Sequence, residues 1–317
     1  MLLYDKMKET SSLLLTFLLQ SEKRWSKGGF RLMIRIKAPA KINLSLSIIG
    51  KQAHFHEVEM VMTTIDLADY ITISKIPDSK NQIILQTDST TMTIGRGNLV
   101  YRAAELFMKH YKLTDSVEIQ IEKNIPIAAG LAGGSSDAAA TFKGLRTLFD
   151  VDCSDEELCK LGTKIGSDVP FCIIGNTALA TGRGEIITPI KSPPLCWVII
   201  INPRLSVSTR DVYGAFELEK AEKIDTNLML NAIENQNFDE ICMHLANNLE
   251  PVTTKILPII NDIKEALHLS GANGVKMSGS GPTVFALVYT EKKAKQIYHQ
   301  MKQKFPAFTI HISRLLV

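Results

Sequence analysis

Apolar and polar residues alternate strictly after Met33, and this alternation predicts the first strand of the fold. A period of two residues is typical of a strand that buries one of its faces. The apolar positions of this strand are Ile34, Ile36, Ala38, Ala40, Ile42, Leu44 and Leu46. Lys41 and Asn43 share the opposite face. That geometry could present an ammonium and an amide side by side toward a site, but an isolated Lys-x-Asn pair favours an exposed polar face.

Strands and helices interleave along the rest of the chain. Further strand-like runs are 58–64, 70–76, 82–86, 116–121, 197–201, a short strand near Val275, 283–288 and 308–312. Helical periodicity covers 98–110, the segment after a glycine-rich loop at 130–134, 154–165, 208–248, 257–267 and 291–304. The order has no regular β-α-β repeat, so the sequence predicts an α+β fold with antiparallel sheets rather than a doubly wound parallel sheet.

Length and composition restrict the class of protein. A chain of 317 residues indicates about two domains, and 45% hydrophobic with 22% charged residues supports a packed core and excludes a disordered chain. The net charge of +3 is too small to indicate a nucleic-acid groove or a membrane-adsorbing surface. No apolar stretch reaches the roughly 18 to 20 residues of a membrane span.

Cysteine usage indicates the compartment. The five cysteines include no Cys-x-x-Cys pair and leave an odd one over, which argues against a disulfide framework or a zinc site. We therefore expect a cytoplasmic protein in a reducing environment. No sustained heptad or self-complementary stripe indicates an oligomeric state.

Residues 1–31 differ from the rest of the chain, with a short apolar run at 13–19 and a polar stretch at 20–29. A signal peptide is disfavoured, because no small-x-small cleavage site follows and Asp5 and Glu9 interrupt the basic leader. A frayed amphipathic helix agrees better with the pattern. A true start at Met33 is a third interpretation, and the role of this extension stays open.

The strongest chemical signal is the stretch 126–137, Pro-Ile-Ala-Ala-Gly-Leu-Ala-Gly-Gly-Ser-Ser-Asp. Small residues let successive backbone N–H groups turn toward one point, and the helix that follows adds its positive end. A tight turn with an ordinary N-cap would explain Ser135, Ser136 and Asp137 but not the small residues before them. The stretch is neither a Walker loop nor a dinucleotide fingerprint, so it favours phosphate binding without identifying the nucleotide.

Three weaker signals have both functional and structural interpretations. Asp168 lies after a predicted helix end and two residues before Pro170. Its structural interpretation is a turn residue or an N-cap, and its functional interpretation is a carboxylate that takes a proton from a hydroxyl. The run His54-Phe55-His56 could stack on a base or form an exposed turn. Thr209 and Tyr213 lie one helical turn apart, although core packing is the ordinary role of such a tyrosine.

Taken together, three segments resemble the GHMP kinase superfamily. They are A-P-A-K-I-N-L at 38–44, the glycine-rich loop and helix start at 126–139, and M-S-G-S-G-P-T-V-F-A at 277–286. The phrases G-G-S-S-D-A-A and G-S-D-V-P-F also resemble members that phosphorylate a cytidine diphosphate-linked alcohol. Several ordered motifs are far more specific than one glycine loop, and here they extend from Ala38 to Ala286.

The resemblance implies a two-domain GHMP kinase fold. An S5-like N-terminal domain over 32–192 and a ferredoxin-like C-terminal domain over 193–317 would flank the active site. It implies ATP and Mg²⁺ carried with the nucleotide, a small-molecule acceptor, and a place in isoprenoid precursor synthesis.

The resemblance also assigns residues. Lys41 and Asp168 match the catalytic pair of the family. The ATP-binding positions are Pro126, Ile127, Ala128, Ala129, Gly130, Leu131, Ala132, Gly133, Gly134, Ser135 and Ser136. The substrate-binding positions are Asn43, Phe55, His56, Thr209 and Tyr213.

Two departures from the family pattern bear on these assignments. The chain has Ala-His-Phe-His-Glu at 53–57 where the family has Asp-Gly-Tyr-His-Glu, and Ala128, Ala129 and Ala132 include positions usually held by glycine. An alanine disfavours a positive φ, so the loop is expected to be less accommodating. Two alternatives stay open: a related kinase for another alcohol, such as a mevalonate-type substrate, and a nucleotide-binding homologue without turnover.

Overall fold

The computed structural model describes residues 19–26, 29–52, 55–76 and 80–316. The chain forms two compact units. The first unit comprises Met1–Ala38, Ala68–Lys123 and Gly134–Ile173, and the second comprises Pro39–Leu67, Asn124–Gly133 and Ile174–Val317. Two long strands, β2 (Gly29–Lys51) and β3 (His56–Ile76), contribute residues to both units.

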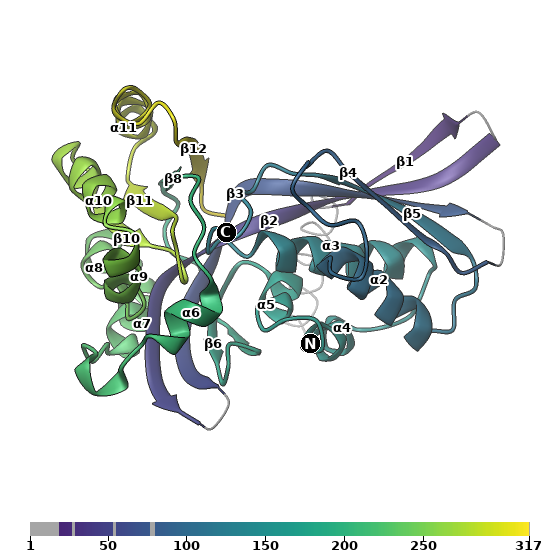
Figure 1. Cartoon of the computed structure of the whole chain (residues 1–317), viewed down its shortest axis with the longest axis horizontal. Coiled ribbons are helices and arrows are strands. Elements are labelled where there is room, and N and C mark those ends of the chain that lie inside the picture. The colour runs from purple at the N-terminus through teal and green to yellow at the C-terminus, as the bar shows by residue number, and fades with distance from the viewer. Residues whose placement is uncertain (1–18, 27–28, 53–54, 77–79, 317) are drawn as a thin grey trace. The chain divides into compact units, whose positions relative to one another are not determined.

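The first unit is a sheet covered by helices. Its strand order is β1-β2-β3-β5-β4, with β1 (Leu19–Ser26) antiparallel to β2, β5 (Ser116–Glu122) antiparallel to β3, and β4 (Ile83–Thr87) parallel to β5. The helices are α2 (Leu99–His110), α3 (Gly133–Leu148), α4 (Asp155–Gly162) and α5 (Val169–Ile174). Helices α2 and α3 lie along the sheet (Figure 1), where Phe107 and Phe142 join Ile36, Ile73 and Ile119 in one fully buried core. This packing fixes the start of α3, which the glycine-rich loop precedes.

The second unit contains another sheet in the order β10-β11-β8-β12, antiparallel throughout. Its strands are β8 (Trp197–Asn202), β10 (Gly274–Met277), β11 (Val284–Val288) and β12 (Thr309–Arg314). Helices α10 (Ile259–Leu269) and α11 (Glu291–Lys304) lie along this sheet (Figure 1). The remaining elements are β6 (Thr177–Thr181), β7 (Ile186–Pro189), α6 (Thr209–Gly214), a 3₁₀ turn (Leu218–Lys220), α7 (Thr226–Glu234), α8 (Phe238–Met243), β9 (Ala246–Asn247) and α9 (Glu250–Ile256).

The alternation after Met33 forms a strand as predicted. Every apolar position from Ile34 to Leu46 is buried, with at most 2% of its surface exposed. The predicted strands 58–64 and 70–76 are instead one continuous strand, β3. The polar residues between them do not end it, because Asp69 is buried and its carboxylate pairs with Lys123.

The N-terminal extension is partly a strand. Residues 19–26 form β1, which pairs with residues 29–36 of β2. The prediction of an amphipathic helix is therefore wrong for this part. Backbone pairing with the edge of β2 supplies the hydrogen bonds that a short frayed helix would lack. The apolar run before Leu19 lies outside the described residues.

The predicted helical stretch 208–248 is broken into α6, the 3₁₀ turn, α7 and α8. Polar caps cause the breaks, since Asp225 accepts a hydrogen bond from the amide of Asn227 and Asn237 accepts one from Glu240. The elements β6, β7 and α9 were not predicted. Among the described residues, no helix is both long enough and apolar enough to cross a bilayer.

Candidate active site

Lys41 is buried in the second unit, on the face of β2 that was expected to be exposed. Lys41 is 4% exposed and Asn43 is fully buried, and the Lys41 Nζ donates a hydrogen bond of 2.5 Å to Asn43 Oδ1. Ser45 and Ser47 continue this buried polar face. The exposed-face interpretation is therefore wrong here. Burying an ammonium costs free energy unless it is paired, which makes this lysine a candidate for chemistry.

The glycine-rich loop adopts the conformation of an anion-binding loop. Its backbone φ is positive at alternate residues, with 52° at Ala128, 75° at Gly130 and 55° at Ala132. Such alternation turns successive N–H groups toward a common concavity. The amide of Lys41 donates a 3.1 Å hydrogen bond to Leu131 O, which ties the loop to β2. Phosphate binding is what this geometry suits best.

Helix α3 begins earlier than the sequence predicts. It starts at Gly133, so Ser135, Ser136 and Asp137 lie in its first turn and do not form the N-cap. The N–H groups that lack intrahelical partners are therefore those of the first four residues, which immediately follow the loop.

A glycine turn at 278–282 packs against the loop within the second unit. A Cβ added at Gly130 would lie 2.1 Å from Ser278 O, and the Ser278 hydroxyl donates a 3.0 Å hydrogen bond to Gly130 O. A Cβ at Gly279 would lie 3.5 Å from Lys41 Nζ. The turn, the loop and the buried lysine are thus in direct contact. The sequence motif was visible, but no site role was predicted for these residues.

A cluster of rings lies around His56. Its imidazole is 5.5 Å from the Tyr213 ring and 6.0 Å from the Phe216 ring, measured between centroids. The His56 Nε2 atom is buried without a hydrogen-bond partner among the described residues. Burial and the positive charge of Lys51 lower the pKa of His56 from its ordinary 6.5, so the ring is neutral at pH 7. It can therefore accept or donate one hydrogen bond to a ligand.

Two further predicted substrate residues have different partners. Thr209 begins α6, one turn before Tyr213, and its hydroxyl shares a 2.9 Å hydrogen bond with the Ser280 hydroxyl of the glycine turn. Phe55 has its ring 5.7 Å from the Arg183 guanidinium. His54 lies outside the described residues. The structure therefore groups His56, Thr209 and Tyr213 around α6, while Phe55 faces Arg183.

Asp168 belongs to the first unit, where it immediately precedes α5. Its carbonyl accepts a 3.1 Å hydrogen bond from the amide of Cys172, as the predicted N-cap position requires. The same turn lies beside the start of α3, since a Cβ at Gly166 would be 3.9 Å from Ser135 Oγ. Asp168 is thus near the first turn of α3. Lys41 and Asp168 belong to different units, and their pairing stays a prediction.

A buried charge cluster supports the start of α3 in the first unit. Lys123 pairs with Asp69 and, at 2.7 Å, with Asp137, and both carboxylates are fully buried. Burial raises the pKa of Asp137 to about 7, although Lys123 opposes the rise. The sequence analysis missed Asp69 and Lys123, because nothing in their local pattern separates them from surface charges.

The described residues include no group of three or more His, Cys, Asp or Glu side chains arranged to hold a metal ion. The Ser135 hydroxyl, in the first turn of α3, lies near Gly166, which precedes Asp168 by two residues. A hydroxyl and a carboxylate are ligands that suit Mg²⁺ bound mainly by phosphates and water. The donor set therefore fits a metal that arrives with a nucleotide.

Family models and curated relatives match most of the chain. The model for the GHMP kinases N terminal domain matches residues 98–176, and that for the GHMP kinases C terminal matches 229–307. A 4-diphosphocytidyl-2-C-methyl-D-erythritol kinase of Exiguobacterium sibiricum is 46% identical over 270 residues, covering 85% of this chain and 94% of the relative. The protein of the same name from Geobacillus kaustophilus is 48% identical over 270 residues, covering 85% and 93%.

Solved structures share the fold. A crystal structure of 4-(cytidine 5'-diphospho)-2C-methyl-D-erythritol kinase, 28% identical, has a TM-score of 0.74 and covers 89% of this chain and 98% of its own. The L. major mevalonate kinase in complex with R-mevalonate has a TM-score of 0.72 at 17% identity, covering 93% and 98%. The second likeness shows the fold alone. Both confirm the predicted two-domain α+β fold, and the chain belongs to the GHMP kinase family, in the group of the 4-diphosphocytidyl-2-C-methyl-D-erythritol kinases.

Proposed function

We propose that this protein transfers the γ-phosphoryl group of ATP to the 2-hydroxyl of 4-diphosphocytidyl-2-C-methyl-D-erythritol, a step in isoprenoid precursor synthesis. One observation carries the phosphoryl transfer: a buried lysine in contact with a phosphate-type loop and a glycine turn. Relatives at 46% and 48% identity that bear this activity in their names support the acceptor.

The loop and the start of α3 would hold the nucleotide. We propose that the amides of Ala128 to Ser136 bind the phosphates, and the N-terminal end of α3 would add favourable electrostatics. Mg²⁺ carried with the nucleotide would neutralise the negative charge that develops on the phosphates. Ser135, in the first turn of α3, is the residue we propose to hold it.

Asp168 and Lys41 would carry the chemistry. The Asp168 carboxylate is proposed to orient the acceptor hydroxyl and take its proton. The Lys41 ammonium, fixed by Asn43, would stabilise negative charge on the transferring group. Little covalent chemistry is required of the protein, so most of the rate should come from positioning.

The ring cluster would select the acceptor. A flat cytosine can stack on the Tyr213 ring, and the unpaired Nε2 of neutral His56 can hydrogen-bond its polar edge. Asn43 and Thr209 add polar groups beside the lysine and the glycine turn. Phe55 supplies a second ring on the same segment as His56.

Two further proposals accompany this function. We propose a reducing cytoplasm as the compartment, because the five cysteines include no Cys-x-x-Cys pair and leave an odd one over. We also propose that the boundary between the N-terminal and C-terminal domains of the family lies near residues 192–193.

The catalytic pair is tested by Lys41→Ala and Asp168→Ala. We expect kcat to fall by about 10²-fold or more in each, while the Kd for ATP, measured by calorimetry, changes less than about threefold. Lys37→Ala, on the same strand face, and Asp152→Ala, an exposed carboxylate, serve as matched controls. Near-normal turnover in either Lys41→Ala or Asp168→Ala would remove that residue from the mechanism.

A further inference from the structure

The glycine turn at 278–282 contacts three parts of the proposed site in the second unit. Ser278 bonds Gly130 of the phosphate loop, Gly279 lies against Lys41, and Ser280 shares a hydrogen bond with Thr209 at the start of α6. A shift of this turn would therefore displace the nucleotide loop, the lysine and the acceptor helix together. Residues outside the site must therefore hold the turn in position.

The turn is a flexible segment by composition. Gly279 and Gly281 both adopt positive φ, at 57° and 77°, and glycine has the greatest backbone freedom of any residue. The hydrogen bonds of Ser278 and Ser280 and the backbone bond from the Gly281 amide to Ser278 O restrict it in part, and further hydrogen bonds to its backbone come from other elements.

Asn247, at the end of β9, supplies those hydrogen bonds. Its side-chain amide donates to Met277 O and to Gly279 O, each at 2.8 Å, and its Oδ1 accepts from the amide of Leu249 at 2.9 Å. The side chain is buried, with 7% of its surface exposed. One residue thus satisfies two carbonyls of the turn and is itself fixed by the start of α9.

Two residues of α9 assist it. Glu250 accepts a 2.7 Å hydrogen bond from the amide of Met277, and its carboxylate is held in turn by Lys264 and, at 3.8 Å, by Lys276. Thr253 donates to Ser280 O at 3.2 Å.

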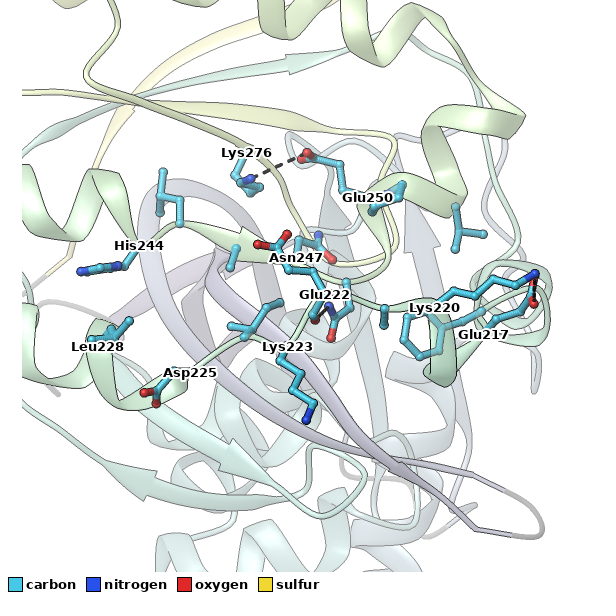
Figure 2. A pocket seen from close by; sticks show the side chains of 18 of the residues that line it. Glu217, Lys220, Glu222, Lys223, Asp225, Leu228, His244, Asn247, Glu250 and Lys276 are labelled. Carbon is cyan, nitrogen blue, oxygen red and sulfur yellow. Dashed lines mark hydrogen bonds and ion pairs between the residues drawn. The ribbon is translucent and has the colours of Figure 1, made fainter.

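The side chains that bond the turn border an open space. Asn247, Glu250 and Lys276 line a cavity of about 450 Å³ (Figure 2). The turn residues themselves are buried, so the hydrogen bonds of Asn247 and Glu250 add to their packing.

We infer that Asn247 is a positioning residue of the kinase: it acts on the reaction by fixing the glycine turn, and it touches neither substrate. This inference rests on the proposed function, because the importance of the turn follows from the roles given to Gly130, Lys41 and Thr209.

The adjacent residue offers a matched control. Asn248 is buried to the same degree, with 6% exposed, and its side chain also makes two hydrogen bonds, to Glu222 O and from the amide of Ile48. Neither bond reaches the glycine turn. Asn248→Ala should therefore destabilise the protein about as much as Asn247→Ala without loosening the turn.

The experiment compares Asn247→Ala, Asn247→Asp and Asn248→Ala in the full chain. We expect kcat to fall about tenfold or more in both Asn247 variants, since a misplacement of about 1 Å can cost on the order of 10²-fold, and less than about threefold in Asn248→Ala. Asn247→Asp keeps the side-chain volume but replaces the amide that donates to Met277 O and Gly279 O with a carboxylate oxygen, which cannot donate. It therefore separates lost hydrogen bonds from lost packing.

Hydrogen–deuterium exchange of the peptide 277–283 in the free protein supplies a readout that needs no activity. We expect faster exchange in both Asn247 variants and wild-type exchange in Asn248→Ala. Equal exchange and equal kcat in Asn247→Ala and Asn248→Ala would overturn the inference. If the wild type phosphorylates no alcohol, the proposed function fails, whereas the exchange comparison still decides whether Asn247 fixes the turn.

Discussion

Two alanines of the phosphate loop have left-handed backbone angles. Ala128 and Ala132 have φ of 52° and 55°, a region that costs an L-residue with a Cβ roughly 1 kcal/mol or more. Replacing both by glycine relieves this strain but increases the entropy of the unfolded chain. We expect the double variant to be more stable by about 0.5–1 kcal/mol, measured by urea denaturation.

Ala129 is the internal control for this loop. Its φ is not positive, and its methyl group is buried. Ala129→Gly should therefore destabilise the protein by about 1 kcal/mol. If Ala129→Gly and the double variant change stability in the same direction, backbone strain at Ala128 and Ala132 does not lower the stability of the protein.

The buried carboxyl of Asp137 should make stability depend on pH. Burial raises its pKa from 3.8 to about 7, so the folded state keeps a proton that the unfolded chain releases. The resulting stabilisation is complete below about pH 4 and is lost as the pH rises toward 7. Asp137→Asn removes this titration, so its stability relative to wild type should increase across that range. If the unfolding free energies of wild type and Asp137→Asn changed with pH in the same way, this would contradict a protonated Asp137 in the folded state.

Single residues were predictable from the sequence only where the pattern was local. Alternation placed Lys41 and Asn43 on one strand face, but it could not show that this face is buried, because the covering elements come from elsewhere in the chain. The partners of Lys123 lie 54 and 14 residues away, at Asp69 and Asp137. No periodicity connects positions at such separations.

The contact between the phosphate loop and the glycine turn requires glycine at position 130. An alanine there would place its Cβ 2.1 Å from Ser278 O, a backbone atom that cannot rotate away. Overpacking and a positive φ together should cost about 2–4 kcal/mol and lower kcat. Thermal denaturation and the ADP-release rate of Gly130→Ala measure both effects.

Gly175→Ala is the matched control for that variant. Gly175 has the same φ of 75°, but nothing lies within 4 Å of an added Cβ. Only the backbone strain of about 1 kcal/mol should then appear. Equal losses of stability in the two variants would show that the loop–turn contact is not tight.

Elements with clear ends were predicted well, and those interrupted by internal caps were not. Helix α11 has the predicted bounds, since Thr290 caps it and its apolar positions keep a helical period. The predicted helix 154–165 begins with a capping box of Ser154 and Glu157, but α4 ends at Gly162 and not near Ile165. Within 208–248, the caps at Asp225 and Asn237 resembled ordinary polar positions of a longer helix.

For the molecule as a whole, fold and substrate have different determinants. One fold can support many activities, so we expect local residues to select the acceptor. Here those residues are the proposed ring cluster of His56, Tyr213 and Phe216, which sequence motifs suggested only in part.

The most direct measurement is ADP release by the purified protein with a panel of alcohols. It would compare 4-diphosphocytidyl-2-C-methyl-D-erythritol, 2-C-methyl-D-erythritol without the cytidine diphosphate, and mevalonate. Because the cytidine should contribute stacking and hydrogen bonds, we expect kcat/KM for the first to exceed the others by at least about 100-fold. Saturable phosphorylation of mevalonate alone, or ATP binding without release of ADP for any alcohol, would contradict the proposed function.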